Sequence, residues 1–374
     1  MTGSHALGYA DAPPALMAGD HDYLHRMLAD MLAAGASDLH LTTGAPPTIR
    51  LNGTLSPLPG YDNLSAKDTQ MLVQATCEPD QLARFLREHE LDFAYSVEGL
   101  SRFRVNAYVQ RGTFGAAFRA IPMTIRPLEE LGLPHSVSSF AALPRGLVLV
   151  TGATGSGKST TLASLLDLAN RSRAGHIITI EDPIEFLHTH KRSLVNQREV
   201  GSDTESFPTA LRHALRQDPD IILVGELRDL ETTSTALSAA ETGHLVLATL
   251  HTQSAIQTID RIIDMYPSDQ HGQIRSQLST ALQGVVSQAL CRRADGKGRV
   301  LIAEVMVATP AVRSLIREGK TVQISTFMQS GTGEGMLSFD QNLAERLAHQ
   351  LINYQDALAL AHSIDDFRRL TGRA

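Results

Sequence analysis

One glycine-rich loop constrains this chain more than any other feature. A short apolar run, Gly146–Thr151, leads directly into the loop Gly152–Ser159, and a segment with a helical pattern, Ser159–Asn170, follows. The loop reads Gly-Ala-Thr-Gly-Ser-Gly-Lys-Ser, which fits the P-loop pattern G-x-x-x-x-G-K-[S/T]. A strand, a glycine turn and a helix in this order predict a parallel α/β sheet with the loop at its carboxyl edge.

The loop also predicts a ligand. Glycines let backbone N–H groups turn inward around phosphate oxygens, and the following helix directs the positive end of its dipole at them. Lys158 would neutralise the β- and γ-phosphates, and the Ser159 hydroxyl would bind Mg²⁺. We therefore expect ATP and Mg²⁺ as cofactors. The residues expected to hold them are Gly152, Ala153, Thr154, Gly155, Ser156, Gly157, Lys158, Ser159 and Thr160.

Further apolar runs follow the loop, and helical patterns separate them. These runs are His176–Ile180, Ile221–Val224, Leu245–Leu250 and Val300–Val307. Buried strands that alternate with helices are typical of a parallel sheet covered on both faces. From about Thr309 the pattern is helical to the end of the chain. The expected fold class is α/β, a P-loop core with C-terminal helices.

The first third of the chain has a different pattern. Tyr23–Ala34 places apolar residues on one helical stripe, and Thr48–Leu51 ends at Asn52-Gly53, a strong hairpin signal. Residues 91–121 alternate in polarity, which predicts two or three antiparallel strands. The predicted parts are a disordered tail (1–20), an α+β domain (21–121), a proline-marked linker (122–135) and the P-loop domain with its C-terminal helices (136–374).

Composition limits the partners. The chain has 33 basic and 40 acidic residues and a net charge of −7, which argues against nucleic acid as a main partner. No apolar run approaches the roughly 20 residues that span a bilayer. We therefore expect a cytoplasmic chain that touches a membrane only through partners. Cys77 and Cys291 form no Cys-x-x-Cys, so we expect two reduced, packed cysteines.

An acid follows the third apolar run. Ile221–Val224 leads into Gly225-Glu226, 68 residues after Lys158. An apolar strand that ends in an acid is the Walker B arrangement, in which the carboxylate holds or polarises the Mg²⁺ shell. Such a strand end is common by itself. In a parallel sheet that already has a P-loop, it favours Glu226 as a metal and catalytic residue.

Carboxylates also cluster after the second run. Thr179–Phe186 contains Glu181, Asp182 and Glu185, which we expect at the same sheet edge as the P-loop. One of them could be the base that orients the attacking water. The alternative interpretation is a solvated acidic turn that begins at Asp182.

Histidines flank the fourth run, and arginines occur on the predicted strands of the first domain. His244 and His251 are structural residues on one interpretation and sensors of the γ-phosphate on the other. Arg102, Arg104 and Arg119 are exposed strand charges on one interpretation. On the other they are arginine fingers that reach the nucleotide of a neighbouring subunit. The residues alone leave both questions open.

Together these motifs resemble a known family. The chain is similar to the type II/IV secretion ATPase superfamily, and specifically to the PilT-like twitching-motility (type IV pilus retraction) ATPases. The resemblance covers the chain from about Leu24 onward. Beside the P-loop, the matching segments are Ala36–Leu41, Arg102–Asn106, Thr179–Phe186 (the aspartate box), Arg216–Glu226, Thr242–Thr252 (the histidine box) and Ala311–Glu318, which departs from the family signature at Val312 and Ser314.

The resemblance implies both an architecture and a task. It implies a PAS-like N-terminal domain on a RecA-like ATPase domain, and a homo-hexamer with nucleotide between subunits. Such a ring would act on an inner-membrane pilus platform protein, with an accessory retraction ATPase as a further partner, at the inner face of the cytoplasmic membrane. ATP hydrolysis would thereby drive pilus retraction and twitching motility.

The same resemblance assigns roles to individual residues. It makes Glu185 the catalytic base, Glu226 the Walker B acid, and His244 and His251 the residues of the histidine box. It matches Arg102, Arg104 and Arg119 to arginines placed around the bound phosphates.

Other functions remain as alternatives. Pilus-assembly and secretion members of the superfamily usually carry a tetracysteine zinc site and an extra N-terminal domain, for which this chain has too few cysteines and too few spare residues. The match at Ala311–Glu318 argues against the accessory paralogue. A non-hydrolysing scaffold of the pilus machinery would not need Lys158, Glu185 and Glu226 together. A DNA translocase is disfavoured by the net charge.

Overall fold

The structure, a computed structural model, describes residues 18–51, 53–122 and 124–373. The chain falls into two units that divide between Ile121 and Pro122, and each is described by itself. Most of the tail expected at residues 1–20 lies outside the described part. Helix α1 begins at Ala18.

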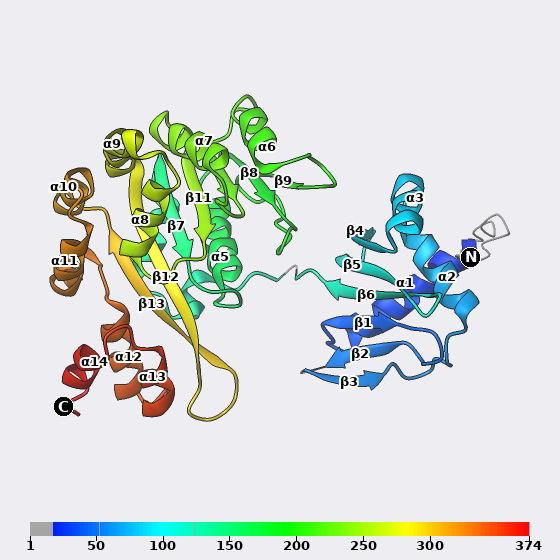
Figure 1. Cartoon of the computed structure of the whole chain (residues 1–374). Helices are drawn as coiled ribbons and strands as arrows, with labels where there is room; N and C mark the ends of the chain where they lie inside the picture. Colours follow the sequence, from blue (N-terminus) through cyan, green and yellow to red (C-terminus); the bar gives the residue numbers. More distant parts are fainter. Residues whose placement is uncertain (1–17, 52, 123, 374) are drawn as a thin grey trace, which may run out of the picture. The chain divides into compact units, whose positions relative to one another are not determined.

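The first unit is an α+β structure built on an antiparallel sheet (Figure 1). Within its described residues the strand order is β3-β2-β1-β6-β5-β4. The strands are β1 (Asp38–Leu41), β2 (Thr48–Leu51), β3 (Thr54–Pro57), β4 (Glu90–Val97), β5 (Ser101–Gln110) and β6 (Thr113–Ala120), and the helices are α1 (Ala18–Ala33), α2 (Ala66–Thr76) and α3 (Pro79–Glu88). Alternation buries one face of the sheet against the helices, and Phe103, Val105 and Phe118 are fully buried there.

Local sequence signals explain most of this unit. The predicted hairpin is confirmed, because Leu51 pairs with Thr54 across the turn and Gly53 has φ +85°; Asn52 lies outside the described residues. The alternating stretch forms β4, β5 and β6 as predicted. Helices α2 and α3 were not predicted. The capping box of Ser65 and Asp68 starts α2.

The second unit is built on a mixed sheet (Figure 1). Within its described residues the strand order is β13-β12-β7-β11-β10-β8-β9. The strands are β7 (Gly146–Thr151), β8 (His176–Glu181), β9 (Leu194–Glu199), β10 (Ile221–Val224), β11 (Leu245–Leu250), β12 (Leu282–Arg292) and β13 (Arg299–Val307). All neighbouring pairs are parallel except β12 and β13, which are antiparallel.

The sheet corrects one part of the sequence prediction. The run Val300–Val307 was expected in a parallel sheet, but it belongs to β13, which pairs antiparallel with β12. The connection between the two strands, residues 293–298, is a short turn, and a short turn can only join antiparallel neighbours. Strand β12 itself was not predicted, because helix α9 leads into it without a break.

Two apolar layers cover the two faces of this sheet. Leu147, Leu149 and their neighbours on one face pack against α6 to α11, while Val148 and Val150 on the other face pack against α5 and the segment 128–143. Burial of each such side chain stabilises the fold by about 1.5–3 kcal/mol. These helices are α4 (His135–Ser139), α5 (Lys158–Ser172), α6 (Phe207–Ala214), α7 (Leu230–Glu241), α8 (Ala255–Asp264), α9 (His271–Ala281), α10 (Pro310–Glu318) and α11 (Ile324–Ser330). The result is the expected RecA-like α/β core.

The last helices dock on the antiparallel edge. They are α12 (Phe339–Ala348), α13 (Tyr354–Leu360) and α14 (Ile364–Leu370). Leu337 and Val305 exchange two backbone hydrogen bonds of 2.8 and 2.9 Å, which join the segment before α12 to β13. Cys77 and Cys291 are free thiols, as predicted. None of the helices described in residues 18–51, 53–122 and 124–373 is long and apolar enough to cross a membrane.

Candidate active site

The glycine loop lies at the carboxyl end of β7. Gly152 has φ +141°, and Gly157, the N-cap of α5, has φ +91°. Both values fall in the region that favours glycine. A Cβ atom on Gly152 would also lie 2.2 Å from the backbone oxygen of Gln288 and 2.6 Å from the Ser156 hydroxyl. The loop therefore needs glycine at position 152 for its conformation and for its packing on β12.

The first turn of α5 fits a phosphate and a magnesium ion. Its first helical hydrogen bond runs from the Thr161 N–H to the Gly157 oxygen at 3.0 Å. The N–H groups of Lys158, Ser159 and Thr160 come before that bond and have no partner within the helix, which is the arrangement that binds anions. The Ser159 side chain is exposed on this turn, and its hydroxyl oxygen is the kind of ligand that suits a hard cation.

Lys158 folds back over the loop. Its ammonium group donates to the carbonyl oxygens of Gly152 at 2.8 Å and Ala153 at 3.1 Å, and it lies 3.4 Å from Nδ1 of His251. Burial lowers the pKa of Lys158, and the Glu226 carboxylate opposes that shift. The lysine is thus a partly desolvated cation that faces the Walker B acid.

His251 joins the lysine to that acid. Its Nε2 lies 3.1 Å from Oε1 of Glu226, whose side chain is 17% exposed. We assign the proton to Nε2, because this tautomer lets Nε2–H donate to the carboxylate while Nδ1 accepts from Lys158. The P-loop and the Walker B strand are therefore bridged by the second histidine of the histidine box.

Arg228 extends this series of contacts, although it was not predicted from the sequence. Its Nε lies 2.8 Å from Oε2 of Glu226, and its guanidinium lies 3.9 Å from Asp182 in the aspartate box. The run Gly225–Asp229 contained a signal for the contact with Glu226. Glu226 and Arg228 are alternate residues, and alternate residues of an extended segment share one side. Leu227 between them is buried, and Asp229 caps α7.

Strand order explains why distant residues converge. In the parallel pairs, Leu250 lies opposite Thr151, Val224 opposite Ala248, and Ile180 opposite Val224. The carboxyl ends of β7, β11, β10 and β8 therefore follow one another along the same sheet edge.

The aspartate box belongs to this edge. The Glu181 carboxylate accepts from the Thr179 hydroxyl at 2.6 Å, from the Gln197 amide at 3.2 Å and from the backbone N–H of Glu185 at 3.3 Å. Burial raises the pKa of Glu181 despite these bonds. Glu185 is exposed. Glu181 is therefore fixed within the protein, whereas the Glu185 carboxylate is open to solvent at the edge that holds the P-loop.

His244 does not join this cluster within the chain. It precedes the first residue of β11, whereas His251 follows the last, so about six residues at 3.3 Å each separate them. The His244 ring contacts the Ala239 oxygen at 3.0 Å, and its own carbonyl accepts from the Gly146 N–H. These contacts are structural, and they lie at the amino end of β7, opposite to the P-loop.

The three predicted arginines lie in the first unit, on the open face of its sheet. Arg104 and Arg119 are exposed and directly opposite each other on β5 and β6. Nε of Arg119 lies 2.7 Å from Asp38, the next residue across the sheet. Arg102 shares this face by alternation. Together they make a basic surface within the first unit.

Strand β12 packs against the P-loop and bonds to it. The buried Gln288 donates its amide to the Ser156 oxygen at 2.9 Å, and the Thr151 and Ser287 hydroxyls lie 2.7 Å apart. In the described part of the chain, the Ser156 hydroxyl is buried without a hydrogen-bond partner, on the side of β12. Ser156 therefore contributes backbone rather than side chain to a phosphate site. A single glutamine in an apolar run was the only sequence signal for Gln288.

Known proteins share this architecture. Residues 130–346 match the family described as Type II/IV secretion system protein. The type IV pilus retraction ATPase PilT of Pseudomonas aeruginosa is 49% identical over 341 residues, which cover 91% of this chain and 98% of that protein. The type IV pilus ATPase PilU of the same organism is 44% identical over 343 residues, 92% of this chain and 90% of PilU.

A solved structure supports the same relationship. The crystal structure of the pilus retraction motor PilT with bound ADP superposes with a TM-score of 0.86 at 45% identity, over 92% of this chain and 98% of that chain. The agreement extends over both units. The chain therefore belongs to the type II/IV secretion system protein family, and within it to the PilT-like ATPases.

Proposed function

We propose that this chain is the ATP-hydrolysing motor that retracts type IV pili. The observation that carries the proposal is the series of contacts from Lys158 through His251 to Glu226. Through these contacts the P-loop, the histidine box and the acid after β10 meet at one sheet edge. PilT, to which the chain is 49% identical, is a retraction ATPase.

Each part of the site has a role in this proposal. The N–H groups at Gly155–Thr160 bind phosphate oxygens, and the Lys158 ammonium moves from the loop carbonyls to the β- and γ-phosphates. Ser159 and Glu226 would hold Mg²⁺, which neutralises charge on the phosphates when it is bound. Glu185, the solvent-open carboxylate, takes the proton of the attacking water.

His251 and the arginines complete the proposal. His251 reports the state of the γ-phosphate, because a change at Lys158 or Glu226 changes what its two ring nitrogens contact. Arg102, Arg104 and Arg119 stabilise transition-state charge at the nucleotide of a neighbouring subunit. His244 has no role at the phosphates within its own chain and would act, if at all, between subunits.

The proposed assembly is a homo-hexamer with ATP between subunits. Residues 21–121 and 136–374 serve as separate domains joined by the linker 122–135, and hydrolysis changes their arrangement. The ring works on the cytoplasmic side and acts on an inner-membrane platform protein, which is its contact with the membrane. An accessory retraction ATPase is a further partner. Nucleic acid is not a partner in this proposal.

Two neighbouring functions compete with this one. Identity to PilU is 44%, against 49% to PilT, so an accessory role beside a separate retraction motor is the second candidate. A pilus-assembly or secretion ATPase is the third. A non-hydrolysing scaffold is disfavoured because the site keeps its lysine and both acids.

Deletion of the gene tests the proposal. A retraction motor predicts more surface pili per cell and no twitching, and both are restored by the wild-type gene but not by Lys158→Ala. Loss of pili would indicate an assembly ATPase instead. Pili that still retract, with only a partial loss of twitching, would indicate the accessory role.

A further inference from the structure

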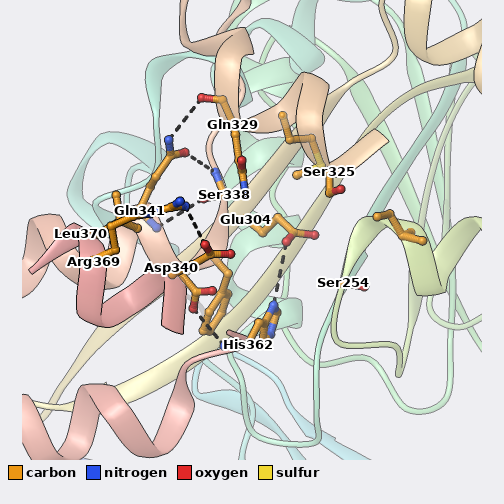
Figure 2. Close-up of a pocket in the computed structure, with 14 residues that line it drawn as sticks. Ser254, Glu304, Ser325, Gln329, Ser338, Asp340, Gln341, His362, Arg369 and Leu370 are labelled. Atoms are coloured by element: carbon orange, nitrogen blue, oxygen red, sulfur yellow. Dashed lines mark hydrogen bonds and ion pairs between the residues drawn. The ribbon is translucent and has the colours of Figure 1, made fainter. Parts of the chain in front are cut away.

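A cavity of about 450 Å³ lies where the C-terminal helices meet β13 and α8 (Figure 2). Two acidic residues in its wall, Glu304 on β13 and Asp340 on α12, are only 7% and 8% exposed. Buried acids are uncommon unless they hold other groups in place. Glu304 and Asp340 each hold backbone N–H groups in place.

Glu304 holds the beginning of α8. Its Oε1 accepts the backbone N–H of Ala255, the first residue of that helix, at 2.6 Å. Ala255 is fully buried, and the N-cap Ser254 satisfies the N–H of Gln257. A carboxylate at this position also interacts favourably with the positive end of the helix dipole.

The same carboxyl group faces the C-terminal helices. Its Oε2 lies 4.0 Å from Nδ1 of His362, and Figure 2 shows the two side chains directed at each other. The His362 ring stacks on Phe339 with centroids 4.1 Å apart. Asp340 accepts the backbone N–H groups of His362 and Ser363, each at 2.9 Å. His362 is thus held firmly where it meets Glu304.

The segment that leads into α8, residues 251–254, begins with His251 and is called the His251 loop below. His251 lies four residues before Ala255, and hydrogen bonds tie the residues between them to the helix. The Thr252 hydroxyl lies 2.7 Å from that of Thr258, and the Gln253 N–H donates to Gln257 at 3.2 Å. A movement of the first turn of α8 must therefore move His251 relative to Lys158 and Glu226.

We propose that Glu304 is a positioning residue for ATP turnover, which holds the His251 loop in place through Ala255 and joins it to the C-terminal helices through His362. This inference rests on the proposed role of His251. On this proposal, Glu304 connects the nucleotide site to the C-terminal helices across the wall of the cavity.

Titration of Glu304 gives the proposal a distinctive test. Burial raises the pKa of Glu304 to about 7, the Asp340 charge adds to that shift, and the Ala255 N–H opposes it. Burial lowers the pKa of His362, so this ring is neutral at pH 7. The other charged groups in the wall are Asp366 and Arg369 of α14, which pair at 2.6 Å, while α8 and α11 present uncharged groups.

The sign of the effect follows from the raised pKa. The folded protein binds this proton more tightly than the unfolded chain, so the contribution of Glu304 to stability falls as pH rises from about 4.5 to about 7. Ionised Glu304, the form that holds Ala255 most strongly, therefore costs stability above pH 7. A group kept at such a cost is expected to contribute to function.

The experiment compares the full-length wild type with Glu304→Gln, which keeps the shape and loses the charge. At pH 8 we expect roughly 10-fold slower ATP turnover in Glu304→Gln, as is typical when a supporting residue is lost. We also expect its melting temperature to be higher by roughly 2–4 °C or more. Below pH 6, where wild-type Glu304 is neutral, the two turnover rates should converge.

Asp366→Asn is the matched control, because it removes an acid from the same cavity without touching α8, and it should keep the wild-type rate at every pH. Equal rates of Glu304→Gln and wild type at pH 8, a rate ratio that does not change with pH, or a Glu304→Gln protein that is unfolded or less stable at pH 8 would each overturn the proposal. If His251→Gln also keeps full turnover, the proposed role of His251 has failed rather than the link to Glu304.

Discussion

Nε2 of His251 lies 3.1 Å from Oε1 of Glu226, while the other ring nitrogen faces Lys158 at 3.4 Å. One side chain thus contacts both the P-loop lysine and the Walker B acid. We therefore expect a change at the phosphates to reach β11 and the segment before α8 through this ring.

His251→Ala should therefore slow ATP turnover roughly 10- to 100-fold, since a group that orients two catalytic residues is lost. His244→Ala is the matched control. It removes a histidine from the other end of the same strand, where the ring contacts the Ala239 oxygen, and it should change turnover much less. Equal losses of ATP turnover in the two variants, measured in steady-state assays, would show that the contacts of His251 with Lys158 and Glu226 do not determine the turnover rate.

Glu185→Gln should bind ATP and fail to cleave it. The amide keeps the shape of the side chain but cannot accept a proton, and loss of general base catalysis typically costs about 10²–10⁴-fold. Nucleotide binding and single-turnover hydrolysis measure the two steps separately. If Glu226→Gln gives this behaviour and Glu185→Gln remains active, the base has been assigned to the wrong carboxylate.

Arg104→Ala should lose ATP turnover, and mixing with a second variant subunit that keeps Arg104 should restore part of it. Arginine fingers contribute about 10³–10⁵ in rate, and an interface between one Arg104→Ala and one Lys158→Ala subunit can still be intact. Mixing the two inactive proteins should restore part of the turnover. Arg50→Ala, on the same sheet face but bonded to the Gly53 oxygen at 2.9 Å, should stay active by itself. Absence of rescue in verified mixed hexamers would count against action in trans.

Helix α10 offers two arginines with different expected effects. Arg313 donates to the Ser279 and Thr280 oxygens, both at 2.7 Å, so Arg313→Ala should lower the free energy of unfolding by roughly 1.5–3 kcal/mol. Arg317 is exposed. Arg317→Ala should keep its stability, its hexamers and most of its ATP turnover, yet stop pilus retraction, because we expect this helix to transmit the nucleotide state to the platform.

Thermal melts, ATPase assays and twitching assays separate these outcomes. Leu315→Ala is less informative, since truncation of a leucine that is 8% exposed costs about 2–5 kcal/mol. An Arg317→Ala protein that retracts pili at the normal rate would leave α10 as an ordinary packed helix.

The parts of the site that follow one local pattern could be predicted from sequence. Glycine, lysine and serine spacing defines the P-loop, and Glu226 ends an apolar run, so neither depends on knowing the strand order. The contacts of His251 do depend on it, because β11 lies between β7 and β10. The sequence offered His244 and His251 as a pair, and only the direction of β11 separates them.

Residues supplied by β12 and β13 were beyond such reasoning. Gln288 contacts the P-loop because β12 pairs with β7, and β12 was not predicted. Glu304 lies on β13, which was predicted as a parallel strand and pairs antiparallel with β12. For Arg228, the alternation with Glu226 was visible in the sequence, but its contact with Asp182, which follows β8, depends on the strand order. In the first unit, the hairpin at Gly53 and the strands β4 to β6 were predictable from turn chemistry and alternation, whereas the helices α2 and α3 were not predicted.

The most direct test of the central claim is Mg²⁺-dependent ATP hydrolysis by the purified full-length chain and by Lys158→Ala. The wild type should release phosphate steadily, and Lys158→Ala should fall to background while keeping its melting temperature, because the charge on the β- and γ-phosphates is then uncompensated. Near-normal phosphate release by a folded Lys158→Ala protein, or no release by the folded wild-type protein, would contradict the account.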